Sequence, residues 1–114
     1  MIVISNNPLV LEEIDNNHPV TGTPFDVLLE VRKYLNSRGS LVSMPLPANQ
    51  RLFINPYRSI VLDETLKDSS MRGMVLLENA IERFRSQNFN YEASADKDFA
   101  LMDLEQVKIA LGMI

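Results

Sequence analysis

The sequence contains no cysteine, and it has a single histidine, His18. Without cysteine the chain cannot form disulfides, thiolate nucleophiles, or cysteine-ligated zinc and iron–sulfur sites. The acidic residues near the histidine, Glu12, Glu13 and Asp15, do not have the fixed ligand spacing of zinc motifs. We therefore predict no metal site and no cofactor, and we interpret His18 as a residue of a solvated loop.

Glycine is also scarce, with four residues scattered along the chain at Gly22, Gly39, Gly73 and Gly112. This spacing contains neither the dinucleotide-binding fingerprint nor the phosphate-binding P-loop. The Gly-x-Ser-x-Gly turn that presents a catalytic serine is missing too. The sequence thus argues against these nucleotide sites and against a Ser–His–acid hydrolase.

Basic residues are outnumbered, because 11 lysines and arginines stand against 15 acidic residues and give a net charge of −4. Binding to nucleic-acid phosphates needs a surplus of positive charge, so we predict no nucleic-acid partner. No apolar run approaches the roughly 20 residues of a membrane span. The apolar start, residues 1–4, breaks at Ser5 and has no basic region before it, unlike a signal peptide. We expect a cytoplasmic protein without a membrane partner.

What the chain does have is the composition of one globular domain, with 46% hydrophobic and 23% charged residues over 114 residues. Short apolar runs alternate with segments of helical periodicity, which favours an α/β fold. We predict a single domain, residues 1–114, with a small, mostly parallel sheet of about four short strands and helices packed on it, Rossmann-like or flavodoxin-like. The predicted strands are residues 1–5, 41–44, 59–62 and 99–102, with a short edge strand near 19–20, and the predicted helices are residues 9–14, 24–38, 71–87 and 103–114.

Two predicted helix starts carry specific signals. Thr23 can cap the first, Pro24 suits its first helical position, and Asp26 favours the positive end of the helix dipole. The last segment can be read as one long helix, or as a strand followed by a helix that Asp103 caps. We favour the second interpretation, because Gln106 three residues later completes a capping box.

A long connection, residues 45–57, contains three prolines and joins two predicted strands. Long connections are often functional, and ligands of open α/β sheets bind beyond the strand ends. Amide, phenol and guanidinium groups at these ends would suit a small carboxylate or phosphate. The alternative is that the prolines and asparagines only shape the loop. The candidate ligand-binding residues are Asn6, Asn7, Asn49, Arg51, Asn55, Tyr57, Arg58 and Ser59.

Several of these segments resemble the GrdX family, small bacterial proteins named from glycine reductase gene clusters. The resemblance is clearest in Asn55-Pro56-Tyr57-Arg58-Ser59-Ile60. It extends over Ser5-Asn6-Asn7-Pro8-Leu9-Val10, Asp26-Val27-Leu28 with Val31-Arg32, Pro45-Leu46 and Asp103-Leu104, and so spans most of the chain. The family has no established activity, so the resemblance implies at most an association with amino-acid reduction by selenoenzyme systems.

The family pattern has histidines in a Gly-His and a His-Pro-Leu beside the second main strand. This sequence has Gly39-Ser40 and Met44-Pro45-Leu46 at those places. If the family histidines do chemistry, this member lacks it.

Three hypotheses follow. The first is a non-catalytic binding or accessory protein that uses the strand-exit face. The second is an enzyme acting on a small anionic substrate, with Arg58 binding the anion and Asp63 or Glu64 as the acid–base group. A cleft that gathers Asn7, Arg58 and a carboxylate of raised pKa would favour the enzyme. The third is a homodimeric protein–protein adaptor, which a flat apolar patch on residues 71–84 or 113–114 would favour.

Overall fold

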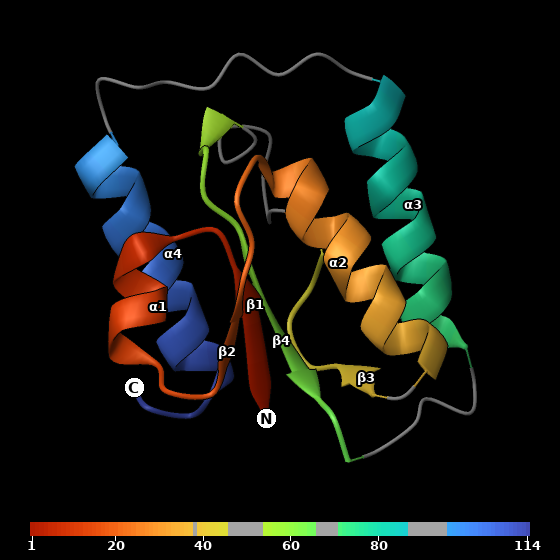
Figure 1. Cartoon of the computed structure of the whole chain (residues 1–114), viewed down its shortest axis with the longest axis horizontal. Helices are drawn as coiled ribbons and strands as arrows, with labels where there is room; N and C mark the ends of the chain where they lie inside the picture. The colour runs from red at the N-terminus through yellow and green to blue at the C-terminus, as the bar shows by residue number, and fades with distance from the viewer. Residues whose placement is uncertain (38, 46–53, 66–70, 87–95) are drawn as a thin grey trace.

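Four strands and four helices make up the computed structural model (Figure 1), which describes all residues except 38, 46–53, 66–70 and 87–95. The strands form one sheet in the order β2-β1-β4-β3. In chain order the elements are β1 (Ile2–Ser5), α1 (Pro8–Glu13), β2 (Asn17–Pro19), α2 (Pro24–Ser37), β3 (Ser40–Leu41), β4 (Ser59–Asp63), α3 (Arg72–Ser86) and α4 (Asp96–Ala110). The prediction of a small α/β domain with a four-stranded sheet is confirmed.

The sheet is mixed, so the prediction of a mostly parallel sheet was wrong. Only β1 and β2 pair in parallel, whereas β4 is antiparallel to both β1 and β3. A parallel pair needs a crossover connection, usually a helix, and the proline-rich stretch before β4 carries no helical periodicity. The chain therefore returns in the opposite direction. A Rossmann-like or flavodoxin-like fold is not confirmed.

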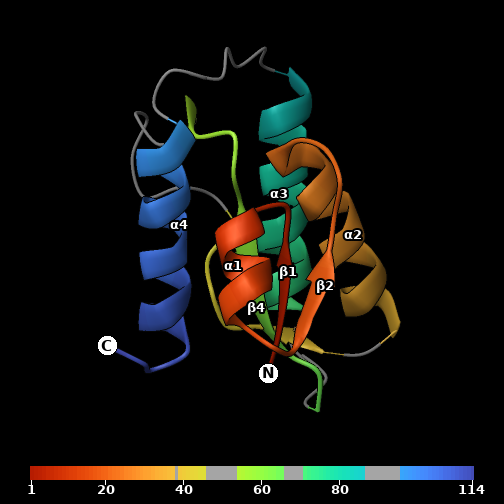
Figure 2. The ribbon, with the colours of Figure 1, turned by 60° about the vertical axis from the view of Figure 1, so that its left-hand side comes forward.

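Alternation along β1 and β4 sends their side chains to two different faces. Val3 lies opposite Val61, and Ser5 lies opposite Ser59, so these four side chains share one face. The helices α1 and α4 cover this face, and α2 and α3 cover the other (Figure 2). The core of the α2/α3 face contains Ile2, Ile4, Val27, Leu28, Val31, Leu35, Ile60, Leu62, Leu77, Ala80, Ile81 and Phe84. The core of the α1/α4 face contains Val3, Val10, Ile14, Val61, Leu104 and Val107.

The helix α2 begins at Pro24, as predicted. The capping side chain at this end is that of Asp26, whose Oδ2 accepts the backbone N–H and the hydroxyl of Thr23, at 2.8 and 3.1 Å. Past its C-terminal end, Gly39 has φ +103°, a conformation that glycine adopts without strain.

Two predicted strands differ from the structure. Residues 96–110 form one continuous helix, so the predicted strand at 99–102 and the cap at Asp103 were wrong. Ala100, Leu104 and Val107 repeat at helical spacing and pack as one buried face. The predicted strand 41–44 is reduced to β3, because Val42 and Ser43 both donate to the Val61 carbonyl and this bulge ends the ladder.

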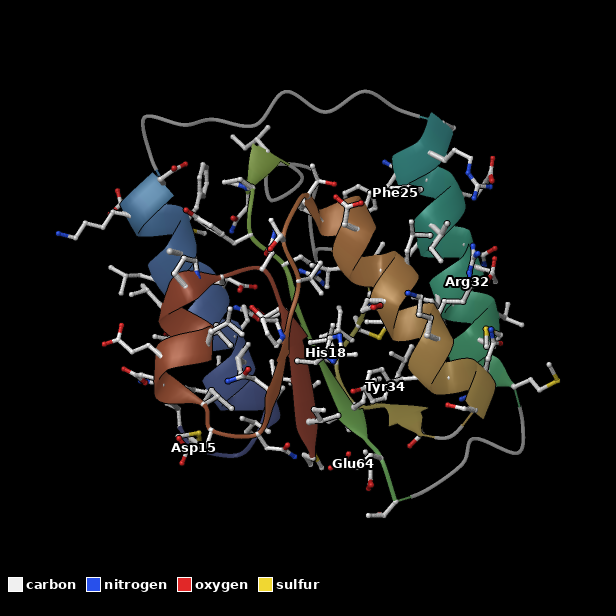
Figure 3. The ribbon with its side chains drawn as sticks, in the orientation of Figure 1. Asp15, His18, Phe25, Arg32, Tyr34 and Glu64 are labelled. Atoms are coloured by element: carbon white, nitrogen blue, oxygen red, sulfur yellow. The ribbon has the colours of Figure 1, made fainter. Side chains whose placement is uncertain are left out.

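The histidine lies on an edge strand and not in a loop. His18 belongs to β2, and its Nδ1 lies 3.2 Å from the hydroxyl of Tyr34 on α2. Both residues are labelled in Figure 3. Its Nε2 is 3.7 Å from Glu30 Oε1. In the described part of the chain, no three acidic or histidine side chains gather into a group that could hold a metal ion. None of the described helices is long and apolar enough to cross a membrane.

Candidate functional site

The predicted site residues that the structure describes gather at one end of the two central strands, where β1 ends and β4 begins. At this end the hydroxyls of Ser5 and Ser59 lie 2.7 Å apart, as expected for directly opposed residues of antiparallel strands. Asn6 and Asn7 follow β1, and residues 55–58 precede β4. Asn49 and Arg51 lie outside the described residues.

Asn6 holds two loops together. Its Nδ2 donates to the carbonyls of Gly22 and Pro56, both at 2.9 Å, and its Oδ1 accepts the Arg58 backbone N–H at 2.8 Å. The side chain thus uses both amide hydrogens and its oxygen on backbone groups. Its role is to fix the segment that carries Arg58.

Asn7 links α1 to α4. It is buried and caps α1, because its Oδ1 accepts the Leu9 backbone N–H at 3.1 Å. Its Nδ2 donates to the Ala100 carbonyl at 2.9 Å and to Asp103 Oδ2 at 3.0 Å. The two helices on this face of the sheet are therefore joined through one amide.

Asp103 is the acceptor on which a buried hydrogen-bond network converges. Its side chain is on a residue only 5% exposed, and Oδ2 accepts the Ser59 hydroxyl at 2.6 Å as well as the Asn7 amide. Since the Ser59 hydrogen points to Asp103, Ser5 donates in the Ser5–Ser59 contact. Ser5 Oγ in turn accepts the Asn7 backbone N–H at 2.9 Å. We call Ser5, Asn7, Ser59 and Asp103 the buried network.

The pKa of Asp103 is raised, chiefly because burial disfavours its charged form. Hydrogen bonds from Ser59 and Asn7 and the positive charge of Arg58 act in the opposite direction. This carboxyl therefore holds a proton to a higher pH than a solvated aspartic acid does.

Arg58 brings a second, partly buried charge to the same place. Its Nη2 donates to the Met44 carbonyl at 2.6 Å, while its Nε is buried and has no hydrogen-bond partner. Burial lowers the pKa of the guanidinium, and the negative charge of Asp103 opposes this shift. No nitrogen of Arg58 comes within 4.0 Å of an Asp103 oxygen, so these two described residues form no direct ion pair.

A cavity of about 40 Å³ lies against both charges. Asn55 shapes one wall, because it accepts the Tyr57 backbone N–H at 2.8 Å and donates to the Phe99 carbonyl at 3.2 Å. The lining residues are Asn55, Tyr57, Arg58, Met102, Asp103 and Gln106. Three predicted site residues, Asn55, Tyr57 and Arg58, thus line this cavity. Asn6 hydrogen-bonds to Arg58, and Asn7 and Ser59 hydrogen-bond to Asp103.

The sequence-based prediction missed the contribution of α4. On a continuous helix, Met102, Asp103 and Gln106 lie on adjacent positions of one side, at spacings of one, three and four residues. The signal was the same Asp103–Gln106 spacing that we interpreted as a capping box. Reading residues 98–114 as one helix would have placed both polar side chains on a shared surface.

The predicted acid–base residues lie elsewhere. Asp63 and Glu64 follow the far end of β4, so roughly 17 Å of extended strand separates Asp63 from Arg58. Asp63 Oδ1 accepts both the backbone N–H and the hydroxyl of Thr65, and Glu64 Oε1 accepts the Asn16 amide. Figure 3 shows Glu64 at that opposite end of the strand. Neither carboxylate can act together with Arg58.

A second cavity, of about 290 Å³, lies between β3 and the start of α3. Ser40 and Met44, the positions at which the family resemblance implies histidines, both line it. The other lining residues are Leu41, Val42, Ser43, Arg72, Gly73 and Leu76.

Comparison with known proteins gives one result. Searches of the curated proteins and of the solved structures found no significant match. A family model described as GrdX-like protein matches residues 2–112, which include both strand-exit segments and all of α4. The resemblance seen in the short motifs thus extends over nearly the whole sequence, and the chain belongs to the GrdX-like protein family.

Proposed function

We propose that this chain is a non-catalytic binding or accessory protein that holds a small anion in the 40 Å³ cavity beside Arg58. The observation that carries the proposal is the Arg58 guanidinium, which lines the cavity and has no carboxylate oxygen within 4.0 Å among the described residues. Its Nη2 donates to the Met44 carbonyl, and its Nε makes no hydrogen bond. An anion in the cavity would supply the opposite charge that the guanidinium lacks at close range.

A binding role fits the way in which the remaining polar groups are used. The hydroxyls of Ser5 and Ser59 are buried and donate within the network, so neither is presented to a ligand as a nucleophile. Asp103 Oδ2 already accepts two hydrogen bonds. These groups therefore hold the residues around the cavity in place and are used in hydrogen bonds within the protein.

An enzyme is the second candidate, and Asp103 is the observation that favours it. It has a raised pKa, contacts Asn7 and shares the cavity with Arg58, which is the combination expected of an active site. Asp103 would then replace Asp63 or Glu64 as the acid–base group. Chemical conversion of a bound anion by the wild type, and its loss in Asp103→Asn, would favour this candidate.

A homodimeric adaptor is the third candidate. Met71 and Val75, at the start of α3, are 63% and 58% exposed, and Met113 and Ile114 are 58% and 73% exposed. Exposed apolar side chains in groups are typical of contact surfaces. A mass of about 26 kDa, twice the 13.0 kDa of the chain, in light scattering would support this role.

The test of the proposed anion site is a thermal-shift screen with small carboxylates and phosphates. A ligand at 100 times its dissociation constant stabilises the folded state by about 2.7 kcal/mol. We expect such a shift for the wild type and its loss in Arg58→Gln. Arg32→Gln is the matched control, because Arg32 pairs with Glu78 on the opposite side of the molecule.

Two results would contradict the proposal. A shift that persists in Arg58→Gln would remove Arg58 from the site. A flat response across the whole panel would leave the adaptor as the better candidate.

A further inference from the structure

Arg58 and Asp103 carry opposite charges and line the same cavity, yet they do not form a direct ion pair. Buried charges are normally paired or hydrogen-bonded, because taking an unpaired charge out of water costs several kcal/mol. A group in this cavity must therefore accept a hydrogen bond from Arg58 and, toward Asp103, offer a hydrogen. A carboxyl group does both when it shares one proton with Asp103.

The small size of the cavity, about 40 Å³, favours a small anionic group. One water needs about 10–15 Å³ of such space. A carboxylate group has three heavy atoms and phosphate has five, so a carboxylate enters the cavity more readily.

The surroundings of Asp103 decide where the proton goes. Its partners from α1 and β4, Asn7 and Ser59, are neutral donors, and Arg58 is the charged group that faces it. Tyr57 is the other titratable residue of the cavity wall. Two carboxylates held together in one site cannot both stay ionised easily, so they share a proton.

On the basis of the proposed function, we infer that the cavity binds a monocarboxylate together with one proton, which the carboxyl group shares with Asp103. One oxygen of the ligand accepts a hydrogen bond from the Arg58 guanidinium, and the other lies against the Asp103 carboxyl. The proton comes from solvent, and no covalent bond changes. Burial already raises the pKa of Asp103, which lowers the cost of this proton.

The test is titration calorimetry with formate and acetate in two buffers of different ionisation enthalpy, at several pH values. We expect proton uptake that approaches one per bound anion above the pKa of Asp103, and affinity that falls by up to tenfold per pH unit there. Asp103→Asn should bind acetate without proton uptake and without this pH dependence, because its amide supplies the hydrogen. Acetamide, the uncharged isostere of acetate, is the ligand control.

The outcomes separate this inference from the proposed function. Binding of acetate without proton uptake, stronger binding of phosphate than of acetate, or equal binding of acetamide would overturn the inference while the cavity remained a binding site. No binding of any of these anions would overturn the proposed function itself. The pH dependence of the wild type tests the inference even if Asp103→Asn fails to fold.

Discussion

The two faces of the sheet are built from the same two strands but in different ways. On the α2/α3 face, Ile2, Ile4, Ile60 and Leu62 pack in one cluster with apolar residues of the two helices. The alternate residues of the same strands face α1 and α4. They are Val3 and Val61 in the middle of the strands, and Ser5 and Ser59 of the buried network at the end. One face is an apolar core, and the other combines a smaller core with buried polar groups and charge.

This difference indicates a division of tasks. A dry, apolar core gives stability through burial and close packing. Buried polar groups contribute less and must be fully hydrogen-bonded, but they fix the position of charged side chains. The α2/α3 face therefore supports the sheet, while the α1/α4 face positions Asp103 beside Arg58.

The largest expected effect tests the apolar face. Leu77→Ala should lower the free energy of unfolding by about 2–5 kcal/mol, because the side chain is completely buried in the larger cluster. The matched variant on the other face, Leu104→Ala, should cost less, since its cluster is smaller and its side chain is 6% exposed. Urea denaturation measures both values. An equal or larger loss in Leu104→Ala would break the comparison.

A smaller effect is expected from the polar link on the α1/α4 face. Asn7→Ala should lower the free energy of unfolding by about 1–3 kcal/mol, because it removes the cap of α1 and the bonds to Ala100 and Asp103. Asn7→Ser keeps a capping oxygen but loses the reach to α4. The difference between the two variants in chemical denaturation isolates the cap, and no difference would mean that the cap contributes nothing.

The smallest effect is expected at the rim of the α2/α3 face. Arg32 and Glu78 join α2 to α3 with a 2.9 Å ion pair that is partly exposed. Arg32→Gln should lower the free energy of unfolding by about 0.2–1 kcal/mol, and added salt should reduce this loss. Stability curves at low and high salt provide the measurement. A loss as large as that of Leu77→Ala would show that charge, not burial, holds these helices together.

The sequence predicts the parts of the fold that depend on neighbouring residues. The caps and apolar periodicity place α2 and α3, and the short apolar runs place β1 and β4, within one or two residues of their observed bounds. The direction of β4 is not encoded locally, because it depends on pairing with β1 and β3, which lie far away or outside its own segment of the sequence. The same holds for α4, whose continuity depends on packing against β4 and α1.

The site was only half predictable for a similar reason. Arg58, Tyr57 and Asn55 are marked by their density of donors at a strand end. The only local mark of Asp103 is its spacing to Gln106, because its partners Ser59 and Asn7 are 44 and 96 residues away in the sequence. The sequence did indicate buried polar groups at this place, because a serine stands at the end of one apolar strand and at the start of the other.

The buried network also has a consequence for the order in which the molecule forms. The bonds that join β1 to β4, and those that join Asn7 and Ser59 to α4, close chain loops of 44 to 96 residues, so they cannot form within a local segment. Contacts of such high sequence separation are slow to form, because the chain loses the entropy of loop closure before the contacts can lower its free energy. During synthesis Ser5, Asn7 and Ser59 emerge well before Asp103. Their polar groups must stay hydrated until α4 docks, which makes the docking of this helix the late step that commits the chain to its native topology.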